Sequence, residues 1–313
     1  MKNSTNSDKD QFPDVLRIET SGVCNFRCIH CPTGTAPSGR QILPRVKFHS
    51  ILNQFATNDF VPRVVVLYHG GEPLLNKDLA YFITTLKKLG VKKTVLTTNA
   101  SLLTRERAED IIKSGLDLLK VSFDGESPEE NDRIRQNGKF SRDAANVKAL
   151  LKMREALGLK NPLVTICNSI ICDKTSLDSL HKSENFFFSK PPAYLADYFK
   201  DELKEIDIQS MPTIVWPGYI KTEDFKVITY DTKKPEYCDS LFETITILSN
   251  GDVVPCCYDL RGEEVFGNVF EKNIFDIWRS KKYTAFRSDF KKGLYSKLCA
   301  ACNLVTPRYL CKK

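Results

Sequence analysis

No apolar run in this sequence approaches the roughly 20 residues that cross a membrane. Runs such as Val64-Val65-Val66-Leu67 have the length of a β-strand, and residues 1–11 are polar and charged, without the apolar stretch of a secretory signal. We therefore expect a cytoplasmic protein with no membrane partner. Disulfides are uncommon in that compartment, so the eleven cysteines indicate metal or cluster ligation.

The composition is ordinary for a soluble globular chain: of 313 residues, 42% are hydrophobic and 27% are charged. The net charge of +7 suits an anionic small molecule, a peptide or a nucleic acid. The basic stretch from Trp278 to Lys297 is the best candidate for binding nucleic acid. A solvated helix face has the same composition, and we favour that interpretation over a nucleic-acid partner.

A fourth cysteine is missing beside the first three. Cys24, Cys28 and Cys31 are separated by three and then two residues, so the thiols can all face one point. Each can ligate a different iron of a [4Fe–4S] cube, which leaves one iron without a protein ligand and open for chemistry. A zinc site is the alternative, but it requires a fourth ligand at short spacing, and the next cysteine is Cys167.

Segments typical of strands and helices alternate through the first two thirds of the chain. We expect strands at 15–20, 63–68, 93–98, 116–123, 163–171 and 205–209, and helices at 46–55, 77–89, from 104, 142–157 and 177–187. This order predicts an α/β fold with a parallel sheet and right-handed crossovers. Polar or glycine-rich residues after several strands favour a partial (β/α)6 barrel of the TIM type.

The pattern changes toward the C-terminus. Residues 188–235 carry prolines and aromatics without a clear period, and we interpret them as a bridging segment that includes the last barrel strand. Residues 236–313 are predicted to form a small α+β module, with a hairpin at 244–254 around Asn250-Gly251 and a helix at 274–290. This module has too little core to fold alone without a metal.

A second group of cysteines lies in the module. Cys238 precedes Cys256 by 18 positions, and the pair Cys299 and Cys302 follows the expected helix. Four thiolates can hold either a zinc ion or a second [4Fe–4S] cluster. Of the other cysteines, Cys172 is interpreted as a core residue, Cys257 as a neighbour of the site, and Cys311 as an alternative ligand or a tail thiol.

The loop Cys24-Asn25-Phe26-Arg27-Cys28-Ile29-His30-Cys31 resembles the signature of the radical S-adenosylmethionine (SAM) superfamily, with His30 in its aromatic position. Gly70-Gly71-Glu72-Pro73 strengthens the resemblance. The cysteines and the segment 251–258 of the module resemble the SPASM/twitch subgroup. Ala100 stands where the superfamily has glycine, and four of the seven cysteines of the full SPASM pattern match, so we expect one auxiliary cluster.

The resemblance implies which residues bind the cofactors. The SAM-binding [4Fe–4S] cluster falls to Cys24, Cys28 and Cys31, and the auxiliary [4Fe–4S] cluster to Cys238, Cys256, Cys299 and Cys302. SAM itself is expected to contact residues after several strands: His30, Gly70, Gly71, Glu72, Thr98, Asn99, Ser122 and Asp124. Ordinary turns and caps use the same residue types. An external one-electron reductant such as flavodoxin or ferredoxin is also implied.

The implied activity is reductive cleavage of SAM to a 5′-deoxyadenosyl radical that abstracts a substrate hydrogen. The single-cluster spacing is similar to that of aminocyclitol dehydrogenases, which favours an oxidoreductase acting on a polar, sugar-like small molecule. One alternative is a peptide maturase or epimerase, in which residues 188–235 dock a peptide and Cys167 donates a hydrogen atom. Another is a cluster- or zinc-binding module without enzymatic activity.

These expectations divide the chain into four parts. Residues 1–13 are a flexible N-terminus, 14–187 the radical SAM core, 188–235 the bridging segment, and 236–313 the auxiliary-cluster module.

Overall fold

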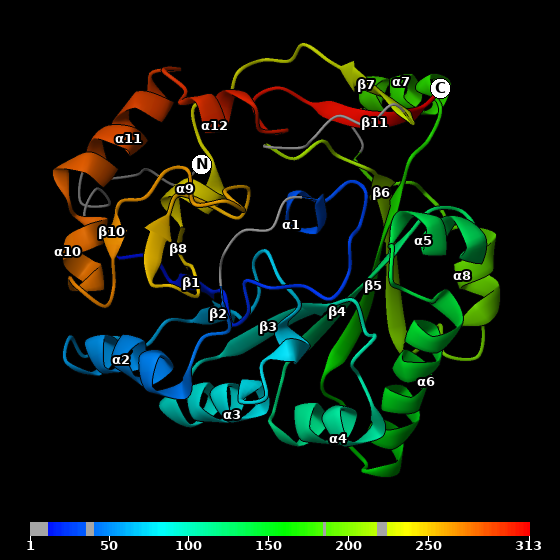
Figure 1. Cartoon of the computed structure of the whole chain (residues 1–313), viewed down its shortest axis with the longest axis horizontal. Helices are drawn as coiled ribbons and strands as arrows, with labels where there is room; N and C mark the ends of the chain where they lie inside the picture. Colours follow the sequence, from blue (N-terminus) through cyan, green and yellow to red (C-terminus); the bar gives the residue numbers. More distant parts are fainter. Residues whose placement is uncertain (1–11, 36–40, 184–185, 218–223) are drawn as a thin grey trace.

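The computed structural model describes residues 12–35, 41–183, 186–217 and 224–313, and Figure 1 shows how they are arranged. The expected flexible terminus lies outside the described residues apart from Phe12 and Pro13. The main feature is one sheet of nine strands in the order β10-β9-β8-β1-β2-β3-β4-β5-β6. Among the described residues, no helix combines the length and the apolar composition of a membrane span.

Six consecutive parallel strands form the first part of this sheet: β1 (Val15–Ile18), β2 (Val64–Val66), β3 (Lys93–Thr98), β4 (Leu118–Asp124), β5 (Leu163–Ile170) and β6 (Ile206–Pro212). The helices α2 (Arg45–Ala56), α3 (Leu79–Leu89), α4 (Arg105–Lys113) and α6 (Phe140–Ala156) cover its outer face (Figure 1). The predicted α/β fold, a partial (β/α)6 barrel followed by a small cysteine-rich module, is confirmed.

Alternation along β1 shows how the strands separate two environments. Leu16 and Ile18 are fully buried in the core that also contains Phe48 of α2 and Phe82 of α3, whose ring centroids lie 4.0 Å apart. Each such side chain stabilises the fold by about 1.5–3 kcal/mol through burial. Arg17 lies between them and therefore points to the opposite face of the sheet, the barrel interior.

Two predicted helices have different bounds in the structure. α7 (Lys174–Lys182) begins after Asp173, whose side chain accepts a hydrogen bond from the Ser176 amide, and ends before the expected 187. The helix expected at 274–290 is two helices, α10 (Ile274–Trp278) and α11 (Lys281–Lys291). Ser280 separates them because its backbone is extended and its hydroxyl accepts from the Tyr283 amide, which makes it an N-cap.

Several short elements were not predicted. They are α1 (Pro32–Thr35), the 3₁₀ turn η1 (Pro73–Leu75), α5 (Pro128–Ile134), α8 (Ala193–Tyr198), β7 (Phe225–Thr229), α9 (Asp239–Phe242), β10 (Gly267–Asn268), α12 (Lys297–Ala300) and β11 (Arg308–Lys312). All have seven residues or fewer, which is too short for a hydrophobic period to be recognised.

The C-terminal module continues the barrel sheet. β8 (Thr244–Ile247) pairs in parallel with β1, and β9 (Asp252–Val254) returns antiparallel to β8 in the predicted hairpin. Gly251 has φ +94° at the turn, a conformation that glycine adopts without strain. The core is also continuous, because Phe12 and Phe275 approach with ring centroids 4.2 Å apart. The module therefore shares the core of the barrel.

The chain end returns to the top of the barrel. β11 pairs antiparallel with β7 in a separate two-stranded sheet, which lies above the ends of β5 and β6 in Figure 1. Cys311 of β11 forms a backbone β-bridge with Cys172, which lies just after β5. The bridging segment thus contributes β6 to the barrel and β7 to this second sheet.

Candidate functional site

The three-cysteine loop follows β1 at the end of the sheet where the parallel strands terminate. Its path is held by backbone hydrogen bonds from Arg27 N to Gln136 O and from Ile29 N to Ile134 O, each 3.0 Å long. Cys28 is buried, and Cys24 and Cys31 are partly buried. The segment after α5 therefore fixes the loop as an added strand would.

Burial governs the chemistry of these thiols. It raises the pKa of Cys24 to about 11, with the Phe26 amide opposing the shift. Burial also raises the pKa of Cys28, and the cation of Arg135 partly opposes it. Both thiols are neutral near pH 7 unless a metal cation stabilises the thiolate, so this donor set fits an iron–sulfur cluster and not a free nucleophile.

A buried charge network lies beside the loop, centred on Asp124 at the end of β4. Its carboxylate accepts a hydrogen bond of 2.8 Å from Arg135 Nη1, lies 3.3 Å from His30 Nε2, and accepts from the Ser169 hydroxyl. Burial would raise the pKa of Asp124, but the charges of His30 and Arg135 outweigh it and hold that pKa well below its usual range. The network therefore keeps a buried anion ionised.

Glu72 forms a second network at the ends of β2 and β3. Its buried carboxylate accepts hydrogen bonds from the Leu74 amide at 3.0 Å, the Thr98 hydroxyl at 2.7 Å and the Asn99 amide at 2.8 Å. Burial raises the pKa of Glu72, and these donors oppose the shift. The carboxylate thus accepts hydrogen bonds from the protein itself, and it fixes the conformation of the strand end where SAM contacts were expected.

Asn99 extends this network to the cysteine loop. Its side-chain amide donates to Asn25 Oδ1 at 2.9 Å, and its carbonyl oxygen accepts from the Ser101 hydroxyl at 2.6 Å. Asn25 in turn donates to Ser101 Oγ at 2.8 Å. A closed ring of side chains therefore ties the loop to the end of β3.

Gly71 has a steric role toward the same loop. A Cβ atom at this position would lie 2.3 Å from the carbonyl oxygen of Ser21 and 2.4 Å from that of Val23. The adjacent Glu72 amide donates to Val23 O at 2.8 Å. Glycine is required here because the chain before Cys24 occupies the space of a side chain.

Glu19 connects the barrel to the module. Its carboxylate, fully buried, accepts from the Gly70 amide at 3.2 Å and, through its other oxygen, from the Ser249 amide at 3.1 Å and hydroxyl at 2.9 Å. Gly70 begins the glycine-rich turn after β2, and Ser249 begins the hairpin turn after β8. One side chain therefore sets both turns.

Polar residues of β4, β5 and β6 line the barrel interior. The strand register places Ser122, Cys167 and Gln209 side by side. All three are partly buried, whereas Val121 and Ile166 on the opposite face belong to the helix-covered core. Burial raises the pKa of Cys167, with Lys120 opposing the shift, so the thiol is neutral near pH 7. This face offers hydrogen-bonding groups to a polar substrate.

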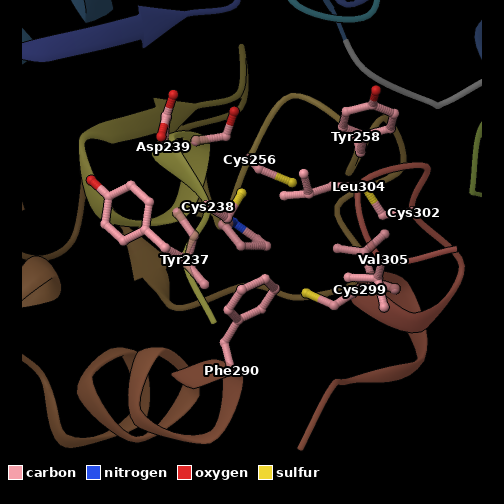
Figure 2. Close-up of a pocket in the computed structure, with 14 residues that line it drawn as sticks. Tyr237, Cys238, Asp239, Cys256, Tyr258, Phe290, Cys299, Cys302, Leu304 and Val305 are labelled. Carbon is pink, nitrogen blue, oxygen red and sulfur yellow. The ribbon is translucent and has the colours of Figure 1, made fainter. Parts of the chain in front are cut away.

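The second cysteine group surrounds a cavity of about 290 Å³ in the module (Figure 2). Cys238 precedes α9, Cys256 follows β9, Cys299 lies in α12, and Cys302 follows it. All four line the cavity, together with apolar residues such as Phe290 and Val305. The structure thus brings together four thiols that are up to 64 positions apart in the chain.

The four thiols share one electrostatic environment. Burial, together with the charge of Cys238, raises the pKa of Cys299 to about 11 and that of Cys302 to about 12. Burial also raises the pKa of Cys256, with added contributions from Cys257, Cys302 and Cys299. Four apposed thiols that ionise reluctantly fit a cationic metal cluster with protein ligands on every side.

The other cysteines lie outside these two sets. Cys257 has its sulfur 3.8 Å from Ser240 Oγ and does not line the cavity. Cys311 and Cys172 are opposite each other in a backbone β-bridge, and Cys311 does not line the four-thiol cavity.

Sequence reasoning missed several residues of the site: Glu19, Asn25, Arg135 and Tyr194. Tyr194 of α8 donates to the Asp124 carbonyl at 3.1 Å, and burial keeps the pKa of its phenol far above the ordinary value. Arg135 gave no signal because it follows a helix too short to predict. Glu19 was detectable in principle, since a carboxylate ending an apolar parallel strand must have a buried partner.

Two family models match parts of this chain. The family model described as the radical SAM superfamily matches residues 18–172, and SPASM, described as an iron–sulfur cluster-binding domain, matches residues 238–303.

Similar proteins cover almost the whole chain. The AdoMet-dependent heme synthase of Methanosarcina barkeri is 26% identical over 93% of this chain and 91% of its own length. The S-adenosyl-L-methionine-dependent 2-deoxy-scyllo-inosamine dehydrogenase of Niallia circulans is 22% identical over 95% of both chains. The crystal structure of BtrN in complex with AdoMet and 2-DOIA has the same fold, with a TM-score of 0.57, 18% identity and 94% of each chain covered.

Proposed function

Because the chain belongs to the radical SAM superfamily and carries a SAM-binding [4Fe–4S] cluster and an auxiliary iron–sulfur cluster, we propose that it oxidises a hydroxyl group of a polar, sugar-like small molecule. The observation that carries the proposal is the four-thiol cavity, whose four cysteines could ligate every iron of a cluster, leave no open ligand position and so suit electron transfer. The match to a dehydrogenase over 95% of both chains supports it.

The reaction balances as the loss of a hydrogen atom from the carbinol carbon, a proton from its hydroxyl and one electron, which leaves a ketone. When bound, SAM and its cluster supply the abstraction of the hydrogen atom, and the auxiliary cluster supplies the one-electron acceptor. The proton leaves to water at the partly exposed interior face. An external one-electron reductant, such as flavodoxin or ferredoxin, serves the first site.

The residues of this chain hold and orient these groups. Cys24, Cys28 and Cys31 would hold the SAM-binding cluster, and the four cavity cysteines the auxiliary cluster. The networks of Asp124 and Glu72 fix the loop and the strand ends around SAM. Ser122 and Gln209 face the interior, where they can donate to and accept from substrate hydroxyls.

The test uses anaerobically purified, reduced protein incubated with SAM and a panel of aminocyclitols and polyhydroxylated sugars. We expect one compound to raise 5′-deoxyadenosine above its background, and a ketone to form in equal amount. The variant Cys24→Ala/Cys28→Ala/Cys31→Ala should lose both products.

Other outcomes identify the alternatives. Stimulation by a peptide alone would replace the proposal with peptide maturation or epimerisation. Zinc without iron in the purified protein would leave only a binding module, and 5′-deoxyadenosine from the triple variant would refute the site assignment.

A further inference from the structure

The positive charge of the chain is concentrated beside the auxiliary site. The segment from Lys272 to Lys297 contains eight basic and two acidic residues, so it carries +6 of the net +7. All six of its lysines are exposed, and we call the five that follow Ser280 the lysine rim: Lys281, Lys282, Lys291, Lys292 and Lys297. The rim runs along α11 to the start of α12, which are neighbours in Figure 1.

Several large residues of this stretch are inside the protein. Trp278 and Tyr283 are buried, and the guanidinium of Arg287 stacks 3.9 Å from the Trp278 ring centroid. Binding of single-stranded nucleic acid relies on exposed aromatic and arginine side chains for stacking. The exposed charge here is mostly lysine, with Arg279 as the exposed arginine, and the aromatic side chains are buried or partly buried, which favours a protein partner with acidic side chains.

A second cavity connects the rim with a cluster ligand. It has a volume of about 280 Å³ and is lined by Phe286, Asp289, Phe290, Leu294, Tyr295, Ser296 and Cys299. Phe290 and Cys299 also line the four-thiol cavity, so the two cavities share a wall. Leu294 is 63% exposed at this place, and Asp289 is the one acidic lining residue.

Together these features have the form of a transient electron-transfer interface. Protein interfaces usually have an apolar centre surrounded by a polar, charged rim. A rim whose charges all have one sign steers partners of the opposite charge toward it, and salt weakens this effect. We propose that an acidic one-electron carrier protein of the flavodoxin class docks on the lysine rim and exchanges electrons with the auxiliary site beside Cys299.

This proposal rests on the proposed function, in which each turnover leaves one electron at the auxiliary site. That electron passes to the oxidised carrier, which becomes its one-electron-reduced form, and no bond is made or broken. The rim is thus a release route for the substrate electron, distinct from the cysteine loop where the first electron enters.

The test compares Lys292→Glu/Lys297→Glu with a matched control, Lys152→Glu/Lys160→Glu, which reverses two exposed lysines of α6 and the loop after it. Neither side chain of the first pair has a hydrogen-bonded partner among the described residues. Lys297 opens α12 after the Ser296 cap, where an acidic residue is favourable, so this half of the variant should not weaken the fold.

Electron exchange between the cluster-loaded full chain and an acidic flavodoxin is followed by stopped-flow absorbance at several salt concentrations. We expect the rim variant to slow the second-order rate about tenfold at low salt and to lose most of the salt dependence, with the control within about twofold of the wild type. Equal rates and equal salt dependence in all three proteins would overturn the proposal.

Two further measurements separate the remaining explanations. 5′-Deoxyadenosine formed with dithionite, which needs no docking, tests the proposed function independently of the rim. Binding of a single-stranded oligonucleotide that depends on Lys292 and Lys297, with flavodoxin exchange unchanged, would assign the surface to nucleic acid and overturn the proposal.

Discussion

Arg135 and Asp124 form a buried ion pair beside the cysteine loop, with Arg135 Nη1 2.8 Å from Asp124 Oδ2 and side chains that are 9% and 3% exposed. The residues on either side of Arg135 provide the carbonyls that bind the loop backbone. The ion pair therefore links the end of β4, the segment after α5 and the cysteine loop.

Replacing Arg135 should weaken the attachment of the cysteine loop to the segment after α5. Arg135→Gln leaves the Asp124 carboxylate buried with a weaker partner, and we expect a loss of about 3 kcal/mol in the free energy of unfolding. Iron at the first site should fall as well. Arg133→Gln is the control, because its contact with Glu130 is 3.7 Å and its side chain is 55% exposed, so it should cost less than about 1 kcal/mol. Equal effects of the two variants in urea unfolding and iron analysis would contradict the role of the pair.

The free energy of unfolding should depend on pH in a way that Asp124 determines. Its folded pKa lies below the unfolded value of about 3.9, so its stabilising contribution is complete above that pH and is lost as the pH falls below it. Metal-free wild type should therefore exceed Asp124→Asn in unfolding free energy at pH 6, and the gap should narrow between pH 4 and pH 3. A gap that stays constant over this range would show that Asp124 is not held ionised.

Gly71→Ala should be far more damaging than a typical surface change. The new methyl group would meet two backbone oxygens at 2.3 Å and 2.4 Å, so the loop before Cys24 must move. We expect a loss of more than about 2 kcal/mol and poor cluster loading. Gly90→Ala is the matched control, since no atom lies within 4 Å of its Cβ position and its cost comes only from its positive φ, about 1 kcal/mol. Similar melting temperatures for the two variants would be inconsistent with this packing.

Iron content should separate the two cysteine groups. The wild type should contain about eight irons per chain, and replacing Cys299 and Cys302 by serine should leave about four, because only the cavity site is lost. The variant Cys172→Ser/Cys311→Ser should keep about eight irons per chain, because these two residues are opposite each other in a backbone β-bridge outside both cysteine groups. A loss of iron from the second variant would place a ligand outside the four-thiol cavity.

Cys167→Ser should distinguish oxidation from epimerisation. The thiol is neutral and faces the interior, as a hydrogen-atom donor must, but oxidation to a ketone requires no such donor. We expect ketone formation to stay within about threefold of the wild type. Retained 5′-deoxyadenosine with complete loss of the final product would favour epimerisation.

The barrel was predictable because its strands are apolar and its helices long. β3 (Lys93–Thr98) has the predicted bounds, and the register of β4 and β5 follows from their buried faces. Cysteine spacing predicted that Cys238, Cys256, Cys299 and Cys302 form one group, and the structure places all four around one cavity; their role as cluster ligands, and that of the three loop cysteines, stays a prediction.

What the sequence did not reveal depends on contacts between distant segments. The parallel pairing of β8 with β1 joins residues about 230 positions apart, and no local pattern encodes it. The carboxylates show the same limit: the contact of Glu72 with SAM stays a prediction, and the sequence did not reveal that its oxygens accept hydrogen bonds from Leu74, Thr98 and Asn99. Only the partners reveal whether a buried acid serves a ligand or the scaffold.

The β1–β8 pairing joins the barrel and the module in one continuous sheet. Glu19 accepts hydrogen bonds from the turns after β2 and β8 at once, so the glycine-rich turn and the hairpin of the module are joined by one side chain. The relative position of the two cysteine groups is consequently tied to the spacing of neighbouring strands. Removing the module would expose β1 as a bare edge, so the core and the module cannot be exchanged independently between relatives.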